Sequence, residues 1–119
     1  MDERQALSAF AALSQETRLR IVRLLVTAGP AGLAAGALAG EARVSSSNIS
    51  FHLKELERSG LIQSRREGRS IIYRAAYPAL SGLIQFLMRD CCQGHPEVCT
   101  PAVAALAICC NPKGDTAHA

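Results

Sequence analysis

The sequence lacks the features that would place the protein in a membrane or carry it out of the cell. No apolar run reaches the roughly 20 residues that a membrane-spanning helix needs. The N-terminus, MDERQALSAF, is charged and does not have the basic and then apolar layout of a signal peptide. We therefore expect a cytoplasmic protein that does not engage a membrane.

The sequence also lacks the motifs of a thiol enzyme. It has no Cys-x-x-Cys motif, no phosphate-cradling loop after a cysteine, and no prominent grouping of Ser, His and Asp. We therefore expect a protein that is not an enzyme and uses no organic cofactor. Its five cysteines do not indicate a disulfide framework either, because the cytosol keeps thiols reduced. They indicate metal or metalloid binding, or redox chemistry.

A strong excess of charge is also missing. The formal net charge of +3 permits nucleic-acid binding but does not argue for it, so the distribution of charge matters more. The 119 residues, 49% of them hydrophobic, suit one globular domain with a single core, or one protomer of a dimer.

The stretch VSSSNISFHLKELERSG, residues 44–60, has the pattern of an amphipathic helix. Ser45 stands where an N-cap residue belongs, and Gly60 ends the helix as glycine does at C′. One face is apolar, with Ile49, Leu53 and Leu56 at helical spacing. Another face carries short hydroxyls and then cations, namely Ser47, Ser50, Lys54 and Arg58. That face fits a DNA major groove, although a solvated helix has the same pattern.

Helices are also predicted before this stretch. The first covers Glu3–Leu13, and its apolar positions are Leu7, Phe10, Ala11 and Leu13. The second is QETRLRIVRLLVTAG, capped by Ser14 and ended by Gly29-Pro30. Its apolar stripe consists of Leu19, Val22, Leu25 and Val26, widened by Ile21 and Leu24. A short helix over Ala34–Ala42 completes a helix-turn-helix with residues 44–60.

After Gly60 the pattern changes to that of strands. LIQSRR and SIIYRA are separated by Glu67-Gly68, with Arg69 next, which predicts a hairpin because glycine supplies the positive φ of a tight turn. Four arginines lie on or near this hairpin: Arg65, Arg66, Arg69 and Arg74. A charged hairpin tip is often only solvated. Beside a helix-turn-helix, we expect these arginines to meet phosphates or a minor groove.

A last helix is predicted from about Pro78 to Asp90. Its apolar residues are Leu80, Leu83, Ile84, Phe86 and Leu87. Together with the first helix, this is more apolar surface than a small winged domain buries alone. The surplus predicts a homodimer through the first and last helices.

Three runs together resemble the ArsR/SmtB family of metal- and metalloid-responsive repressors. LSQETRLRIVRLL resembles the second-helix signature, VSSSNISFHLKELERSGLI the recognition helix, and RREGRSIIYR the wing. The resemblance covers roughly Leu7 to Leu87. It implies a mainly α winged helix-turn-helix with a small β-hairpin wing, which binds double-stranded operator DNA as a dimer and releases it when an ion binds. We assign 1–92 to this DNA-binding and dimerisation domain and 93–119 to a cysteine-containing, partly disordered C-terminal segment.

The predicted DNA-binding residues lie on the recognition helix and the wing. They are Ser46, Ser47, Ser50, Phe51, Lys54, Arg65, Arg66 and Arg69. Ser46 and Phe51 stand where many family members have glutamine and histidine, so no operator sequence carries over. Phe51 is either a contact to a thymine methyl or a residue of the core.

Two of the family's sensing sites are absent. Ala34 and Gly36 stand where some members have a Cys-x-Cys motif, and no histidine lies between Pro78 and Cys92 to make a zinc site on the last helix. Cys91, Cys92 and Cys99 remain, in the run DCCQGHPEVC. They resemble the site of members that sense trivalent arsenic with cysteines at the end of the last helix.

The chemistry of these cysteines suits a soft ion. Adjacent Cα atoms are about 3.8 Å apart, less than the roughly 4.4–6.8 Å of a disulfide, so Cys91 and Cys92 are better placed to share one ion. Gly94 and Pro96 favour a turn that brings Cys99 back. Three thiolates match the pyramidal coordination of arsenite, As(III), or of Sb(III), the predicted inducer ligands.

Alternatives for the cysteines stay open. His95 with the three cysteines makes a Cys₃His set for zinc or a similar divalent ion such as cadmium. A thiol-redox repressor that pairs Cys99 with Cys91 or Cys92 is another reading, and cysteines without a role in a flexible tail are a third. For Cys109-Cys110 we favour an auxiliary role or none over essential ligands.

Overall fold

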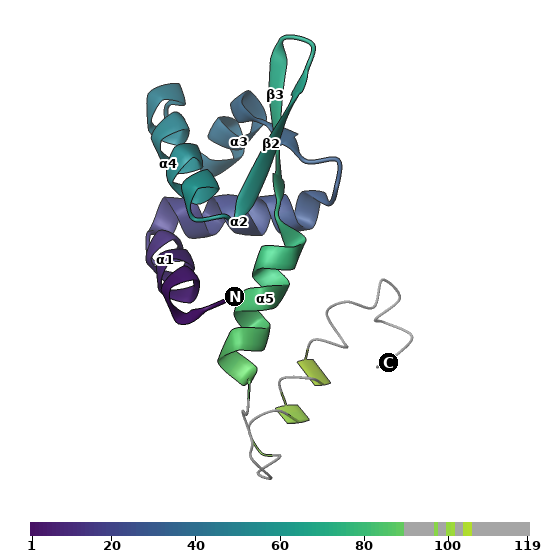
Figure 1. Cartoon of the computed structure of the whole chain (residues 1–119). Helices are drawn as coiled ribbons and strands as arrows, with labels where there is room; N and C mark the ends of the chain where they lie inside the picture. The colour runs from purple at the N-terminus through teal and green to yellow at the C-terminus, as the bar shows by residue number, and fades with distance from the viewer. Residues whose placement is uncertain (90–96, 98–99, 102–103, 106–119) are drawn as a thin grey trace. The chain divides into compact units, whose positions relative to one another are not determined.

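The computed structural model describes residues 1–89, 97, 100, 101, 104 and 105. The chain divides into two units, Met1–Phe86 and Leu87–Ala119, and the contacts discussed below lie within the first. The elements are α1 (Glu3–Leu13), α2 (Glu16–Ala28), β1 (Leu33–Ala34), α3 (Ala35–Ala42), α4 (Ser46–Arg58), β2 (Ile62–Glu67), β3 (Ser70–Ala75) and α5 (Tyr77–Met88) (Figure 1). The predicted mainly helical, winged helix-turn-helix fold is confirmed.

The junction between α1 and α2 differs from the prediction. Ser14 does not cap α2, because its hydroxyl donates to the carbonyl of Ala11 at the end of α1, at 2.8 Å. Gln15 is the N-cap of α2, and its side-chain oxygen accepts from the Arg18 N–H at 2.9 Å. Two consecutive polar residues stand between the helices. Ser14 donates to a carbonyl at the end of α1, and Gln15 accepts from an N–H at the start of α2.

The predicted inner face of α1 is wrong in part. Its buried residues are Ala6, Ala9 and Ala12, whereas Leu7 is 61% exposed. Of the predicted set, only Phe10 and Leu13 pack against the core, and Ala11 is exposed. A face of alanines lets helix backbones approach closely, and in α1 it leaves the larger leucine outside.

The predicted stripe of α2 is confirmed in part. Ile21, Val22 and Leu25 are buried, whereas Leu19 and Val26 are each 46% exposed. In a helix with many apolar residues, the neighbours in the fold decide which part of the stripe becomes core. The predicted end of the helix is confirmed by Gly29, with φ of 80° at its C-cap.

The turn of the helix-turn-helix runs through Arg43, which has a left-handed φ of 60°. This conformation costs a residue with a Cβ about 1 kcal/mol. The Arg43 and Val44 amides donate to the carbonyls of Gly40 and Ala39, at 3.3 and 3.1 Å. Arg20 of α2 donates to the carbonyl of Ala42 at 3.1 Å, so α2 helps to hold the end of α3. The predicted helix Ala34–Ala42 is confirmed except at Ala34, which belongs to β1.

The wing is a three-stranded antiparallel sheet with strand order β1-β3-β2. Glu67 pairs with Ser70 across a two-residue turn, and Gly68 has the positive φ of 62° that the sequence predicted. The hairpin extends past the helices in Figure 1. Strand β1 was not predicted, because its two residues are too few to show a period.

The core gathers side chains from the helices and the base of the wing. Its largest fully buried members are Ile21, Leu25, Leu38, Ile49, Leu53, Leu56 and Leu61. The inward face predicted for α4 is therefore confirmed. Gly60 ends this helix with φ of 84°, and the Leu61 amide reaches back to the Leu56 carbonyl at 3.1 Å. This is the Schellman arrangement that favours glycine.

Helix α5 buries little of its apolar stripe within one chain. Leu83 is buried, and Leu80 and Phe86 pack against the core. Ile84 and Leu87 are 45% and 58% exposed. Among the described residues, no helix has both the length and the apolar character needed to cross a membrane.

Candidate nucleic-acid interface

The face of α4 opposite the core is exposed and mostly polar. Its exposed residues include Ser46, Ser47, Ser50, Phe51 and Lys54. Phe51 is 58% exposed, which excludes the alternative that it is a core residue. Its ring lies edge-on to that of His52, with 5.4 Å between the ring centroids.

Hydroxyl groups at the start of α4 are already hydrogen-bonded within the helix. Ser45 caps it, accepting from the Asn48 N–H at 3.2 Å, and its oxygen lies 3.3 Å from the Ser47 hydroxyl. Ser50 donates to the Ser46 carbonyl at 3.0 Å. Because a hydroxyl has one hydrogen, Ser50 offers only its oxygen lone pairs to a ligand while it keeps this bond.

Three arginines of the wing, Arg65, Arg66 and Arg69, fall into two groups. Arg66 and Arg69 are exposed near the turn, and the Arg66 Nε donates to the Gly68 carbonyl at 3.3 Å. Arg65 is directed back toward the protein. Its guanidinium donates to the Glu67 carboxylate at 2.7 Å and to the carbonyls of Ala31 at 3.1 Å and Pro30 at 3.5 Å. Arg65 therefore holds the loop between α2 and β1 against the wing.

A hollow of about 530 Å³ lies between α4 and the wing. Its lining residues are Glu57, Ile62, Gln63, Ser64, Arg65 and Arg74. The Ser64 hydroxyl donates to the Glu57 carboxylate at 2.7 Å, which connects β2 to α4. Burial raises the pKa of Tyr73, and the charge of Glu57 raises it further. Tyr73 therefore stays neutral under ordinary conditions.

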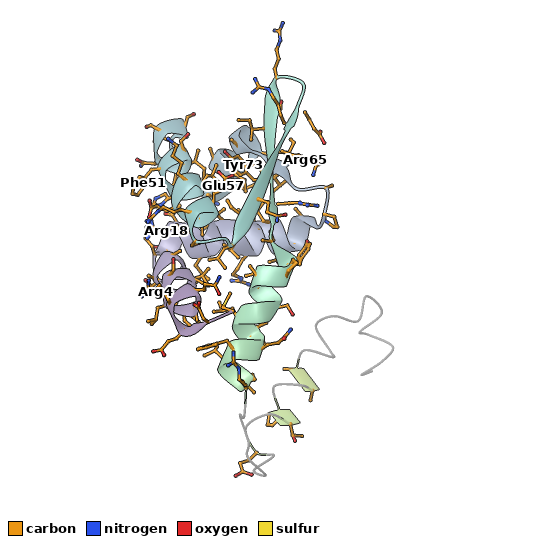
Figure 2. The ribbon with its side chains drawn as sticks, viewed as in Figure 1. Arg4, Arg18, Phe51, Glu57, Arg65 and Tyr73 are labelled. Carbon is orange, nitrogen blue, oxygen red and sulfur yellow. The ribbon has the colours of Figure 1, made fainter. Side chains whose placement is uncertain are left out.

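On the other side of α4, His52 meets Arg18 from α2. The Arg18 Nη1 lies 3.3 Å from the His52 Nδ1, and the Arg18 Nε donates to the Ala12 carbonyl at 2.8 Å. Burial lowers the pKa of His52 from 6.5, and the charge of Arg18 lowers it further. Figure 2 shows Arg18 where α1, α2 and α4 come together, with Phe51 on the outer side of α4.

Sequence reasoning did not single out Glu57, Arg18 or His52. For His52 a weak signal exists, because it precedes the buried Leu53 and therefore flanks the inward face of α4. Its partner Arg18 is 34 positions away and leaves no local pattern.

The predicted cysteine ligands Cys91, Cys92 and Cys99 lie outside the described residues, as do His95, Cys109 and Cys110. Within the described part of the chain, no three His, Cys, Asp or Glu side chains are grouped so that they could hold a metal ion.

The sequence matches known DNA-binding regulators over the helix-turn-helix. A family model described as "Helix-turn-helix domain" matches residues 13–65. Transcriptional activator HlyU of Vibrio cholerae is 31% identical over 84 residues, which cover 71% of this chain and 75% of that protein.

Solved structures share the fold. An ArsR-like transcriptional regulator from Rhodococcus sp. RHA1 is 33% identical with a TM-score of 0.64, over 91% of this chain and 94% of that chain. A homodimeric winged helix-turn-helix DNA-binding domain from Mycobacterium bovis is 28% identical with a TM-score of 0.58, over 80% and 94%. A possible transcriptional regulator for arsenical resistance is 34% identical with a TM-score of 0.58, over 65% and 77%.

Proposed function

This chain belongs to the ArsR family of helix-turn-helix transcriptional regulators, and we propose that it is a metalloid-responsive repressor. It binds operator DNA as a homodimer and leaves it when trivalent arsenic or antimony binds cysteine thiolates. A member of this family of DNA-binding regulators acts by binding rather than by catalysis. The exposed polar face of α4, opposite three buried apolar residues of the same helix, is the observation that carries the DNA-binding part.

In the proposed complex, α4 lies in the major groove. Ser46, Ser47 and Ser50 allow close approach to the bases because their side chains are short. Ser50 accepts from the amino group of an adenine or a cytosine, because its hydrogen is used within the helix. Phe51 contacts a thymine methyl, and Lys54 contacts a phosphate.

The wing contributes contacts to the DNA backbone or minor groove through Arg66 and Arg69. Both are exposed beside the two-residue turn. Arg65 was predicted to join them. Its bonds to Pro30, Ala31 and Glu67 instead favour a supporting role, in which it fixes the direction of the hairpin.

Dimerisation is proposed through α1 and α5. Leu7 and Ile84 are 61% and 45% exposed in the single chain, and α5 buries Leu83 alone. The related M. bovis domain is described as homodimeric. Two copies would read half-sites about 34–36 Å apart, one helical turn of DNA.

The inducer is proposed from the chemistry of Cys91, Cys92 and Cys99. Thiolates favour soft ions, and three of them satisfy As(III) or Sb(III). One related structure is that of a possible regulator for arsenical resistance, which supports the same class of inducer. A zinc- or cadmium-responsive repressor and a thiol-redox repressor are the alternatives.

The experiment measures DNA release under each candidate signal. A duplex selected by the protein from a random pool is bound in the presence of reductant and titrated with arsenite, antimonite, zinc or cadmium. A parallel sample without reductant receives a thiol oxidant. We expect arsenite and antimonite to release the DNA. Release by zinc, by cadmium or by oxidation alone would replace the proposed inducer.

Cysteine variants locate the responsive site. Cys91→Ser or Cys92→Ser should bind DNA normally and ignore arsenite, whereas Cys109→Ser with Cys110→Ser should respond almost normally. If the double variant Cys109→Ser with Cys110→Ser no longer releases DNA on adding arsenite while Cys99→Ser still does, the third ligand lies in the tail.

The direction of regulation needs its own measurement, because the V. cholerae relative is described as an activator. In transcription from a promoter that contains the selected duplex, a repressor lowers the amount of transcript and arsenite restores it. A rise in transcript on adding the protein would make this chain an activator.

A further inference from the structure

We propose that Arg18 and His52 are positioning residues through which α1 sets the orientation of the recognition helix α4. The inference rests on the proposed function, because it concerns how a change at the dimer interface reaches the DNA-reading face. An arginine beside a DNA-binding helix invites assignment to a phosphate contact, but Arg18 is partly buried and bonds within the protein.

Arg18, in α2, bonds to both α1 and α4 and so connects three helices. Its backbone N–H is bound by the cap Gln15, which fixes it in the first turn of α2. Its Nε donates to the Ala12 carbonyl, at 2.8 Å, near the end of α1. Its Nη1 reaches the His52 Nδ1 of α4 at 3.3 Å. A displacement of the end of α1 therefore changes the position of the guanidinium that holds His52.

The direction of the His52 bond follows from the chemistry of arginine. A guanidinium has donors and no acceptor, so the His52 Nδ1 must accept and the ring proton must be on Nε2. The fixed ring lies edge-on to Phe51, with 5.4 Å between the centroids. Phe51 is exposed on the proposed reading face, so the contact with Arg18 also constrains a side chain that meets the DNA.

The surroundings leave room for this junction to change. A hollow of about 170 Å³ is lined in part by Ser8 and Ala12 of α1, Arg18 of α2 and Glu55 of α4. Helix α1 also presents Leu7, 61% exposed, to the proposed partner subunit. A shift of α1 on assembly or release would therefore move the Ala12 carbonyl, and the hollow beside it leaves room for part of that displacement.

Protonation of His52 should open the junction. A doubly protonated imidazole has no acceptor for Arg18, and two positive charges would then face each other. The charged group that faces His52 is Arg18 of α2, and α1 reaches this guanidinium through the Ala12 carbonyl. On α4 itself, Glu55 is paired with Arg58 at 2.5 Å.

A double-mutant cycle tests the coupling. Arg18→Gln, His52→Leu and the double variant are compared for binding to a duplex selected by the unmodified protein and to a scrambled duplex of equal length. We expect each single change to weaken binding to the selected duplex about tenfold, and the double change to cost no more than about the same tenfold. Binding to the scrambled duplex should change much less.

Arg23→Gln is the matched control for charge. Arg23 is an exposed arginine on the same helix, so its loss removes the same charge without touching the junction. It should weaken binding to both duplexes equally. Thermal unfolding of every variant checks that the fold is retained. An additive loss of about a hundredfold in the double variant, or the same behaviour for Arg18→Gln and Arg23→Gln, would overturn the proposal.

A pH series adds a second test, because a purely structural contact would not make the selected-to-scrambled affinity ratio depend on pH. Between about pH 8 and pH 5.5, the selected-to-scrambled affinity ratio should fall for the unmodified protein. The fall should be smaller for His52→Asn, whose side-chain oxygen accepts from Arg18 at any pH. His95 and His118 are present in both proteins, so their contributions drop out of the difference between the two pH curves. If the pH curves of the unmodified protein and of His52→Asn are equal, the proposal is overturned. If the unmodified protein prefers no duplex at any pH, the proposed function itself is refuted.

Discussion

The hydroxyl of Ser64 in β2 donates a hydrogen bond of 2.7 Å to the Glu57 carboxylate in α4, and so links the wing to the recognition helix. The two residues are exposed and do not belong to the core. The bond therefore fixes the placement of the wing relative to α4, the two elements proposed to bind DNA, and in such a complex the carboxylate would oppose the approach of phosphates.

Two variants at this link should have opposite effects. Glu57→Gln keeps an acceptor for Ser64 and removes a negative charge, so it should tighten binding to any duplex. Ser64→Ala keeps the charge and loses the bond, which should lower the free energy of unfolding by about 1 kcal/mol and weaken binding. Urea unfolding and binding to selected and scrambled duplexes measure both. Equal effects of the two changes would contradict a positioning role.

Substitutions of two wing arginines should have different effects on DNA binding in a salt titration. Arg69→Ala should weaken binding to all duplexes and reduce the slope of log affinity against log salt by about one. Arg65→Ala should lower the free energy of unfolding by about 1 kcal/mol instead, because the carbonyls of Pro30 and Ala31 lose their donor. If Arg69→Ala leaves affinity and salt slope unchanged, the wing assignment is wrong.

Gly32 should tolerate no side chain. Its φ is +72°, and an added Cβ would lie 2.2 Å from the Tyr73 carbonyl oxygen, so the pairing of β1 with β3 would have to open. We expect Gly32→Ala to lower the free energy of unfolding by more than about 1 kcal/mol. Gly40→Ala, in α3 with open space around it, should raise it by about 0.5–1 kcal/mol. Urea unfolding checks both, and a harmless Gly32→Ala would contradict the close approach.

Charges placed at the proposed dimer interface should separate the subunits. Leu7→Glu or Ile84→Glu should give a folded monomer in sedimentation, because both side chains are exposed in the single chain and a charge there opposes apolar contact. Ile71→Glu is the control, since Ile71 is 43% exposed on the wing strand β3. A dimer that persists in all three variants would place the interface elsewhere.

The stability of the fold should fall in mild acid through His52. Its pKa is lowered in the folded state, so the unfolded chain binds the proton more tightly. The stability from neutral His52 is therefore complete above about pH 6.5 and is lost as the pH falls from there through the folded value. The melting temperature of the unmodified protein should fall more on acidification than that of His52→Asn. An equal fall would show that His52 is not the group responsible.

The sequence by itself determined the helices, the hairpin and the exposed face of α4. The bounds of α1, the cap Ser45, the end at Gly60 and the hairpin turn at Gly68 follow from neighbouring residues. Caps, turn glycines and the period of apolar residues act within a few positions along the chain. Their effects can therefore be predicted from neighbouring residues. The exposed hydroxyls and Lys54 of α4 follow from the same period, because they lie opposite its buried stripe.

Only the tertiary structure decided which apolar side chains enter the core and which polar ones meet. The alanines of α1 are buried and Leu7 is left outside because of the helices packed beside α1. Arg65 lies against carbonyls 34 and 35 positions earlier, and Arg18 meets His52 34 positions later. Such bonds depend on how separate elements fold together. No local pattern encodes them, and two arginines that look alike in the sequence therefore acquire supporting roles while Arg69 stays exposed at the turn.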